Sequence, residues 1–279
     1  MIDIITVVFE EEIPVLRAQA QSIALYCKKI GIRNIYVVLN DEETVAAKID
    51  PTWWGKFASA VLIVPRTTFS TEFVQDGWVS QQVLKMLAAS LSYNTWSMVL
   101  DAKTIFVREL DPKDITDEIG RMCVGTQDIY PVFEPARLII NQLYNIDLKK
   151  QLGPGGVPFF FQNDVVRLMI AETTFLAAQS FPHWFQARGR VTEFMLYAGY
   201  LQHRFKGFDT FYNERSSFGL VNVCHSDLEI WDQKINEMKT INPLTVSVHR
   251  HAWSRLNPEQ KQQFQYFLIE HGITQAWQL

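Results

Sequence analysis

Short apolar segments alternate with longer segments of helical periodicity through the first hundred residues. Apolar runs occupy residues 4–9, 35–39, 61–64 and 97–100. Between them, apolar residues recur every three or four positions, from Leu16 to Ile30 and from Val79 to Leu91, which is the spacing of one helix face. Strands that are apolar throughout and separated by helices are typical of a parallel sheet covered on both faces. The pattern predicts a β-α-β-β-α-β layer, and with it a Rossmann-like α/β fold.

Two residues set the expected ends of the first helix in this layer. Pro14 stands near its start, where a proline costs no hydrogen bond. Gly31 follows the last apolar position, where a glycine commonly ends a helix. An aromatic loop around Trp53 and Trp54 is expected between the second and third strands.

The second half of the chain is less regular. Its expected elements are a helix over 138–144, a Gly- and Pro-rich turn over 152–158, a strand over 159–161, a helix opened by Asn163 or Asp164, a helix over about 193–204, strands over 220–224 and 245–248, and a last helix capped by residues 257–260. Neither an internal repeat nor a long linker interrupts the sequence. We therefore expect one domain over 1–279, with unequal halves 1–110 and 111–279.

Composition narrows the classes of partner. The net charge is −4 and the pI is near 5.9, so the chain lacks the basic field that holds nucleic acid or an anionic membrane. No stretch approaches the roughly 20 apolar residues that span a bilayer. The chain begins with a strand-like run instead of a basic and apolar leader. These features predict a cytoplasmic protein without a nucleic-acid partner.

The loop after the first strand narrows the ligand chemistry. It reads FEEEIP over residues 9–14, with three acids and no glycine. Ligands of open parallel sheets bind at the carboxyl ends of the strands. Dinucleotide and S-adenosylmethionine sites commonly need a glycine there, because the backbone must approach the ligand closely. The loop, and the lack of a Walker motif, disfavour dehydrogenases, methyltransferases and P-loop NTPases.

Acids follow two of the expected strands. Asp41 comes after the second strand and Asp101 ends the fourth. An acid after the second strand can bind ribose hydroxyls. It can equally be an ordinary turn residue in the polar run over 40–43.

Several stretches of the chain resemble a known class of enzymes. Residues 77–85 read GWVSQQVLK, residues 93–103 read YNTWSMVLDAK, residues 192–200 read TEFMLYAGY and residues 247–250 read SVHR. The first two are similar to the GT-A class of nucleotide-sugar glycosyltransferases, in which a helix with Gln and Lys on one face precedes a strand that ends in an Asp-x-Asp motif. More closely, the chain resembles a poorly characterised family of bacterial and phage glycosyltransferase-like proteins whose motif reads Asp-Ala-Asp or Asp-Ala-Lys. The other two stretches are similar to that family's Ser-Glu-Tyr-x-Leu-Tyr helix start and His-Arg pair.

The resemblance implies a GT-A-like fold, with a mostly parallel sheet, and gives roles to individual residues. Asp101 and Lys103 are two apart on an extended segment and share one face, about 6–7 Å from each other. Transfer from a nucleotide sugar must stabilise a diphosphate leaving group, through a divalent cation or fixed basic side chains. Lys103 can supply that charge directly, while Asp101 binds a hydroxyl or holds a weaker Mn²⁺ or Mg²⁺. The alternative is an ordinary surface ion pair.

Further donor-binding candidates are Phe9 and Asp41 at the first two strand ends, Gln81 and Lys85 on one helix face, and Arg250, which could meet phosphate. A solvated helix face would explain the spacing of Gln81 and Lys85 equally well.

Glu193 is expected in the first helical turn after Thr192, where the helix dipole favours a carboxylate. It is the candidate general base for the acceptor hydroxyl, or else only stabilises its helix. His249, expected to alternate with His251 on a strand, is the candidate that could complete a metal site with Asp101.

The sequence thus predicts an enzyme that moves a sugar from a nucleotide-sugar donor to an unidentified hydroxyl of a small molecule or glycan. Residues 1–110 would bind the donor and residues 111–279 the acceptor. The alternative is a non-catalytic nucleotide- or glycan-binding protein of the same fold, because the second motif acid is missing. A nucleotidyltransferase fits less well, since that chemistry usually needs paired acids and a basic phosphate-binding loop.

Overall fold

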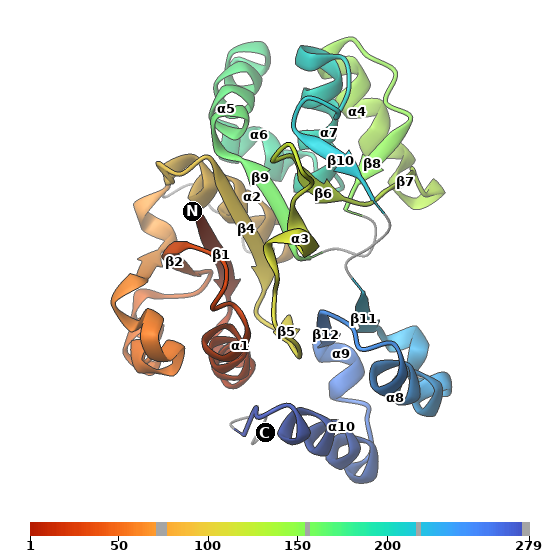
Figure 1. The fold of residues 1–279 in the computed structure, drawn as a ribbon. Coiled ribbons are helices and arrows are strands. Elements are labelled where there is room, and N and C mark those ends of the chain that lie inside the picture. Colours follow the sequence, from red (N-terminus) through yellow and green to blue (C-terminus); the bar gives the residue numbers. More distant parts are fainter. Residues whose placement is uncertain (71–76, 154–156, 216–218, 275–279) are drawn as a thin grey trace.

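A five-stranded sheet lies at the centre of the structure, a computed structural model that describes residues 1–70, 77–153, 157–215 and 219–274 (Figure 1). The strand order is β3-β2-β1-β4-β9. The strands are β1 (Ile2–Val8), β2 (Ile32–Leu39), β3 (Val61–Pro65), β4 (Trp96–Asp101) and β9 (Phe159–Gln162). The first four are parallel, and β9 pairs with β4 in the antiparallel sense. The predicted, mostly parallel α/β sheet is therefore confirmed.

Two helices connect these strands and cover opposite faces of the sheet. The chain passes from β1 through α1 (Ile13–Tyr26) to β2, and from β3 through α2 (Gly77–Leu91) back to β4 on the other side of β1. Right-handed crossovers that run in opposite directions place their helices on opposite faces. Such a reversal opens a crevice at the carboxyl ends of the two strands where it occurs, here β1 and β4.

The second half adds helices above this sheet and a small layer below it (Figure 1). The longer helices are α4 (Glu134–Tyr144), α5 (Asn163–Ala177), α6 (Phe181–Ala187), α7 (Glu193–Phe205), α8 (Trp231–Thr240) and α10 (Pro258–Glu270), and the short ones are α3 (Pro112–Ile115) and α9 (Arg250–Trp253). The 3-10 helices are η1 (Glu10–Glu12), η2 (Glu43–Lys48), η3 (Pro51–Ala60), η4 (Arg66–Thr68), η5 (Pro131–Phe133) and η6 (His225–Ile230).

Three small sheets hold the remaining strands. A three-stranded sheet has the order β11-β12-β5, and two pairs join β10 to β6 and β7 to β8. Their bounds are β5 (Ile105–Phe106), β6 (Met122–Val124), β7 (Thr126–Asp128), β8 (Lys150–Leu152), β10 (Tyr212–Glu214), β11 (Leu220–Val223) and β12 (Thr245–Val248).

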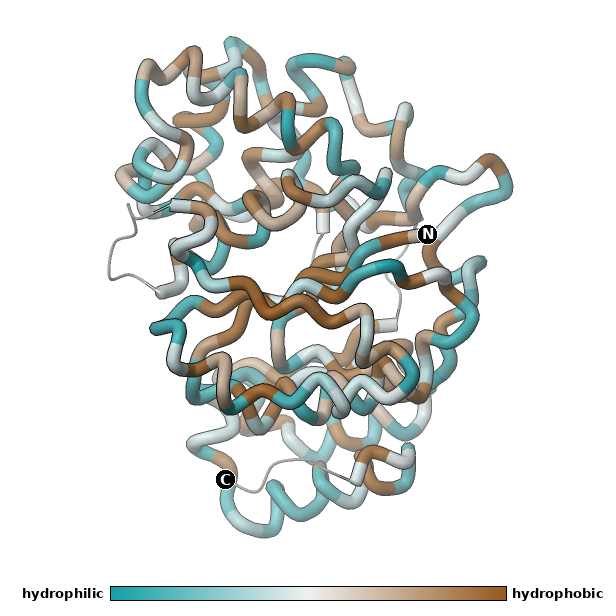
Figure 2. Tube along the Cα trace, turned by 90° about the vertical axis from the view of Figure 1, so that its left-hand side faces the viewer, coloured by the Kyte–Doolittle hydropathy of each residue, from teal (hydrophilic) through white to brown (hydrophobic). Residues whose placement is uncertain are grey.

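The apolar side chains form two buried clusters. The larger contains the central sheet together with α2, α4, α5 and α7, and its apolar strands run through the middle of the molecule in Figure 2. The smaller is built from β5, β11, β12, α8, α9 and α10, and receives Val15 and Ala18 from α1. Because α1 contributes to both clusters, it holds the C-terminal layer against the central sheet.

Several expected elements differ in extent. The first helix ends at Tyr26, not at Gly31, because Gly31 already accepts a hydrogen bond from the Ile2 N–H and β2 begins one residue later. His249 and His251 do not lie on a strand, since β12 ends at Val248 and His249 caps α9. The loop around Trp53 and Trp54 is the 3-10 helix η3, in which Trp54 is buried beneath α1.

Other expectations hold in full or in part. Asn257 and Gln260 form the expected capping box of α10. Helix α5 begins at Asn163, but its N-cap is Gln162, whose side chain accepts the Val165 N–H, and not Asn163 or Asp164. Residues 154–156 of the expected Gly- and Pro-rich turn lie outside the described residues. Within the described part of the chain, none of the helices combines the length and the apolar character that crossing a bilayer requires.

Candidate active site

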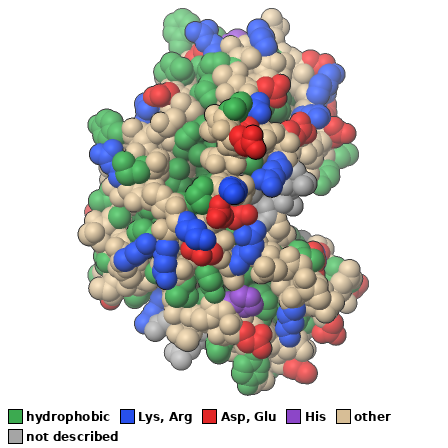
Figure 3. All heavy atoms as spheres, viewed as in Figure 1, with side chains coloured by type: hydrophobic (Ala, Val, Ile, Leu, Met, Phe, Trp, Pro, Cys, Tyr) green, Lys and Arg blue, Asp and Glu red, His purple; other side chains and the backbone are tan. Residues whose placement is uncertain are grey.

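A cavity of about 510 Å³ opens at the carboxyl ends of β1 and β4. Its walls come from the loop after β1, from α2, from β4, from the β7–β8 region, from the start of α7 and from α9. Acidic and basic side chains gather in the middle of the face drawn in Figure 3. The described lining residues are Phe9, Glu12, Trp78, Gln81, Gln82, Lys85, Asp101, Lys103, Gln127, Tyr130, Phe133, Gln151, Leu152, Gly153, Thr192, Glu193, Phe194, His249, Arg250 and His251.

Asp101 lies between two ammonium groups. Lys85 Nζ is 2.8 Å from Asp101 Oδ1, and Lys103 Nζ is 2.8 Å from Asp101 Oδ2. Burial alone would raise the pKa of Asp101, but the charges of Lys103 and Lys85 outweigh it and hold that pKa well below its usual range. Buried Gln19 on α1 fixes the strand end, donating to the carbonyl oxygens of Asp101 and Thr104. Asp101 is therefore ionised and fixed in position.

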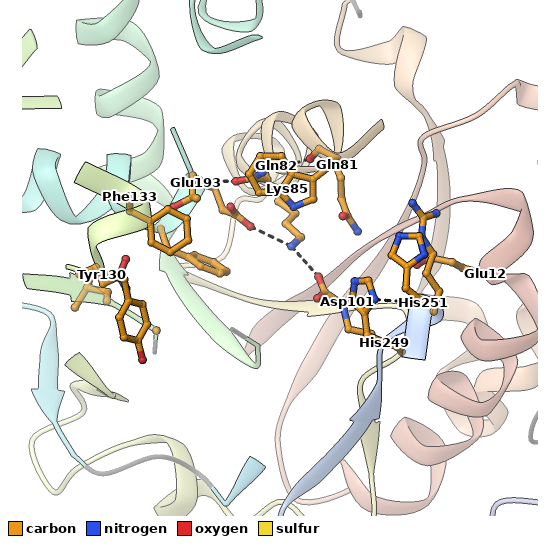
Figure 4. Close-up of a pocket in the computed structure, with 18 of the residues that line it drawn as sticks. Glu12, Gln81, Gln82, Lys85, Asp101, Tyr130, Phe133, Glu193, His249 and His251 are labelled. Atoms are coloured by element: carbon orange, nitrogen blue, oxygen red, sulfur yellow. Dashed lines mark hydrogen bonds and ion pairs between the residues drawn. The ribbon is translucent and has the colours of Figure 1, made fainter. Parts of the chain in front are cut away.

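Lys85 also joins Asp101 to Glu193. Its ammonium is 3.0 Å from Glu193 Oε1, and the two side chains are only 5% and 4% exposed. Burial alone would lower the pKa of Lys85, but the carboxylates of Asp101 and Glu193 hold it above its ordinary value. Figure 4 shows Lys85 reaching down from α2 between the two acids. A buried cation thus holds two carboxylates at fixed positions.

Glu193 is placed by local and distant contacts. The Thr192 side chain caps α7 by accepting the Met195 N–H, so Glu193 falls in the first turn, as predicted. The Glu193 N–H donates to Gln82 Oε1 at 3.2 Å. Its second carboxylate oxygen makes no hydrogen bond within the described part of the chain and is available to a ligand.

A third cation approaches from the C-terminal layer. The Arg250 guanidinium lies 5.4 Å from the centre of the Phe9 ring, within the range of a cation–π contact, and 3.6 Å from Glu11 at the exposed rim. Glu12 lines the cavity and accepts the Phe9 N–H. Burial raises the pKa of the Glu12 carboxyl, against the opposing effect of that hydrogen bond.

The side-chain atoms that were candidates for metal ligands do not suit a divalent metal ion. Both oxygens of Asp101 are occupied by ammonium groups, and His249 Nδ1 accepts the His251 N–H at 3.3 Å. Burial, followed by the charge of Lys103, lowers the pKa of His249 to about 4. No cluster of three or more potential metal ligands occurs over 1–70, 77–153, 157–215 and 219–274. The residues present therefore do not fit a metal ion.

The structure brings most of the sequence candidates together. Phe9, Gln81, Lys85, Asp101, Lys103, Glu193, His249 and Arg250 all line the cavity. Asp41 is the exception among the candidates: it lies beside the loop after β1, accepts the Glu10 N–H, and is not one of the described lining residues. Its predicted role in binding the donor stays a prediction.

Several polar or aromatic lining residues were not candidates from the sequence, among them Glu12, Gln127, Tyr130, Phe133 and Gln151. Glu12 was visible only as one of three acids after β1. Gln127, Tyr130, Phe133 and Gln151 lie on or beside the elements β7, η5 and β8, each of three residues. A three-residue element is too short to show a hydrophobic period, so the sequence held no signal for them.

The sheet order, the flanking helices and the position of the cavity define a GT-A-type fold. The galactosyltransferase LgtC, solved in complex with donor and acceptor sugar analogues, is similar over 96% of each chain, with 10% identity and a TM-score of 0.50. The bifunctional glycosyltransferase WbbM is similar over 97% of this chain and 49% of its own, with 11% identity and a TM-score of 0.51. At such low identity these likenesses establish the fold.

Residues 9–246 match the sequence profile of DUF6492, described as a family of unknown function. The chain belongs to that family. A search of curated protein sequences finds no significant match.

Proposed function

We propose that the chain is a glycosyltransferase that moves a sugar from a nucleotide-sugar donor to a hydroxyl of an acceptor. The observation that carries this proposal is the buried ammonium of Lys85, which joins Asp101 to Glu193 in a cavity at the switch point of a GT-A-type sheet. Two ionised carboxylates beside fixed cations suit a reaction in which a sugar leaves an anionic diphosphate.

The donor is assigned to the cationic side of the cavity. Lys103 and Arg250 present positive charge there, and preorganised cations stabilise a leaving diphosphate without further reorganisation. Because the residues do not fit a metal ion, no step of the proposal passes through one. Asp101, fixed by Lys85 and Lys103, is assigned to a hydroxyl of the donor sugar or ribose. Gln81 and Lys85 support this wall.

Glu193 is assigned as the general base. Its bonded oxygen is held by Lys85, and its other oxygen is available to accept the proton of an acceptor hydroxyl. The proposal keeps the predicted assignment of residues 1–110 to the donor and 111–279 to the acceptor, and adds two residues of the second half to the donor side. Arg250 and His249 come from the second half but line the donor side. Cytoplasmic location, the absence of a nucleic-acid partner and an origin in bacteria or phage stay predictions.

The test is turnover with a panel of UDP-, GDP-, ADP-, CDP- and dTDP-sugars, measured as released nucleoside diphosphate. Glu193→Gln removes the base and should lower the rate by roughly 10²-fold or more. Asp101→Ala should also lower it. Glu259→Gln is the matched control, because Glu259 likewise lies in the first turn of a helix but is exposed and outside the cavity. Wild-type turnover in both Glu193→Gln and Asp101→Ala would overturn the assignment.

A non-catalytic nucleotide- or glycan-binding protein is the second candidate. The pairing of both Asp101 oxygens favours it, since a carboxylate saturated by ammonium groups can serve a purely structural role. Such a protein would bind a nucleoside diphosphate but release none from any nucleotide sugar. The same panel therefore separates the two candidates.

A further inference from the structure

One wall of the cavity carries no charge. It is formed by β7, β8 and the segment between them, and its described lining residues are Gln127, Tyr130, Phe133, Gln151, Leu152 and Gly153. The charged lining residues come from the other walls and are Glu12, Lys85, Asp101, Lys103, Glu193 and Arg250. In Figure 4, Tyr130 and Phe133 lie on one side of the Lys85 contacts, and Glu12, His249 and His251 lie on the other. The cavity is thus divided into an ionic side and a neutral side.

Two amides on the neutral wall have no partner in the described protein. Gln127 and Gln151 are directly opposite in the antiparallel β7–β8 pair, so their side chains project from the same face. Gln151 is only 7% exposed, yet neither amide side chain makes a hydrogen bond with another described residue. Neither amide is among the fully buried polar groups without a partner, so both are accessible from the cavity. A ligand that offers hydroxyl groups would satisfy both.

Aromatic rings lie beside these amides. The Tyr130 side chain is 55% exposed although it lines the cavity, and Phe133 is partly buried against the main core. Recognition sites commonly combine such apolar surface with a few placed polar groups. A pyranose has both matching features, an apolar C–H face for the ring and hydroxyls for the amides. A carboxylate or phosphate on the ligand would lose hydration here without meeting a cation.

We propose that this wall binds the acceptor and that the acceptor is a neutral sugar. The inference rests on the proposed function, because Glu193 borders the wall and would take the proton of the bound hydroxyl. Glu193 lies between Tyr130 and Asp101 in Figure 4. A general base needs such a position, with the acceptor on one side of it and the donor sugar on the other.

Binding can be tested without turnover by saturation-transfer NMR on the full chain. The neutral probes are methyl β-D-galactopyranoside and methyl α-D-glucopyranoside, and the anionic probe is methyl α-D-galactopyranosiduronate, each with and without a mixture of UDP, GDP, ADP and CDP. Tyr130→Ala and Gln151→Ala should each weaken binding of the neutral probes by roughly fivefold to tenfold. Gln127→Ala tests the second amide, at a position that is less buried than Gln151.

Two variants serve as matched controls. Tyr93→Ala removes a tyrosine that is 93% exposed, and Gln233→Ala removes an exposed glutamine on α8. Neither residue lines the cavity, and both variants should bind the neutral probes like wild type.

The outcomes separate this inference from the function on which it rests. Binding of the neutral probes that is lost in the wall variants and kept in the controls supports the inference. It is overturned if the uronate binds as well as the neutral glycosides, if the wall variants bind like wild type, or if no glycoside binds while a nucleoside diphosphate does. Binding of the glycosides without any nucleoside diphosphate supports the neutral wall but contradicts the donor assignment.

Discussion

The buried ammonium of Lys85 allows a direct test of how the ion pairs of the site contribute to stability. Lys85→Met keeps the volume of the side chain but removes the charge that two carboxylates share. Glu193 is only 4% exposed, so it would be left as a buried charge without a partner. Breaking a buried ion pair from one side costs about 3–5 kcal/mol. For a chain of this size that corresponds to a fall in Tm of roughly 5–9 °C.

Lys103→Met is the control for the loss of a lysine beside Asp101. Lys103 is 21% exposed, and Asp101, its one ion-pair partner among the described residues, would keep Lys85. The expected loss is therefore smaller, about 1 kcal/mol or less. Denaturant and thermal unfolding of both variants at pH 7 measure the difference. Equal Tm values for the two variants would refute the claim that Lys85 is the desolvated cation of the site.

The pH dependence gives a second readout of the same variant. The pKa of Asp101 is lowered in the folded state, so its stabilisation is present above the ordinary carboxyl pKa and is lost as the pH falls. The pKa of Lys85 is raised, so its stabilisation is present below the ordinary lysine pKa. The gap between wild type and Lys85→Met should therefore be widest near neutral pH and narrow toward acid. Adding Glu193→Gln to Lys85→Met should recover part of the lost stability, because the orphaned charge is then gone.

Three further outcomes are expected. His249, whose pKa burial and Lys103 lower to about 4, should stay neutral at pH 5.5; an NMR titration midpoint near 6.5 would contradict this. Since the unfolded chain takes up that proton near pH 6.5, His249 should oppose folding as the pH falls from about 6.5 to 4, and His249→Asn should lose less stability in that window. A nucleoside diphosphate at a hundred times its Kd should stabilise the protein by ~2.7 kcal/mol. The resulting rise in Tm should persist in EDTA and be smaller in Lys103→Met. Loss of this rise in EDTA would show that binding requires a metal ion. Gly199→Ala should lower the free energy of unfolding by about 1–3 kcal/mol, because the added Cβ would overlap the side chain of Ile140 on α4. Denaturant unfolding measures this loss, and wild-type stability would show that α4 and α7 are not packed so closely.

The order of strands and helices could be predicted from the sequence because it depends on local patterns. The apolar runs became β1 to β4, since a strand buried on both faces must be apolar along its length. The positions of Asp101 at the end of β4 and of Glu193 in the first turn after Thr192 followed from period and capping alone. These features need no knowledge of distant residues. Lys103 was expected on the same extended segment, but it lies in a turn after β4, in which the Thr104 N–H donates to the Asp101 carbonyl oxygen. The ammonium of Lys103 contacts Asp101 directly from this turn.

Elements with weak local signals could not be placed this way. The end of α1 is set by pairing between Ile2 and Gly31, and the end of β12 is set where His249 turns to cap α9. Gln127 and Gln151 lie opposite each other only because two three-residue strands pair. In the first and third cases the deciding hydrogen bonds join segments whose pairing the sequence period does not encode. In the second, the deciding hydrogen bond is local, from the His251 N–H to His249 Nδ1, and it competes with extension of the strand.

The sequence by itself determined that Asp101 and Lys103 lie at the carboxyl end of β4, and that Glu193 lies in the first turn of α7. Only the tertiary structure decided what they do together. Lys85 and Glu193 are separated by 108 residues, and the burial of Lys85 becomes tolerable because the fold brings two carboxylates to it. The same contacts occupy both oxygens of Asp101, so the positive charge that faces this carboxylate in the structure comes from two lysines.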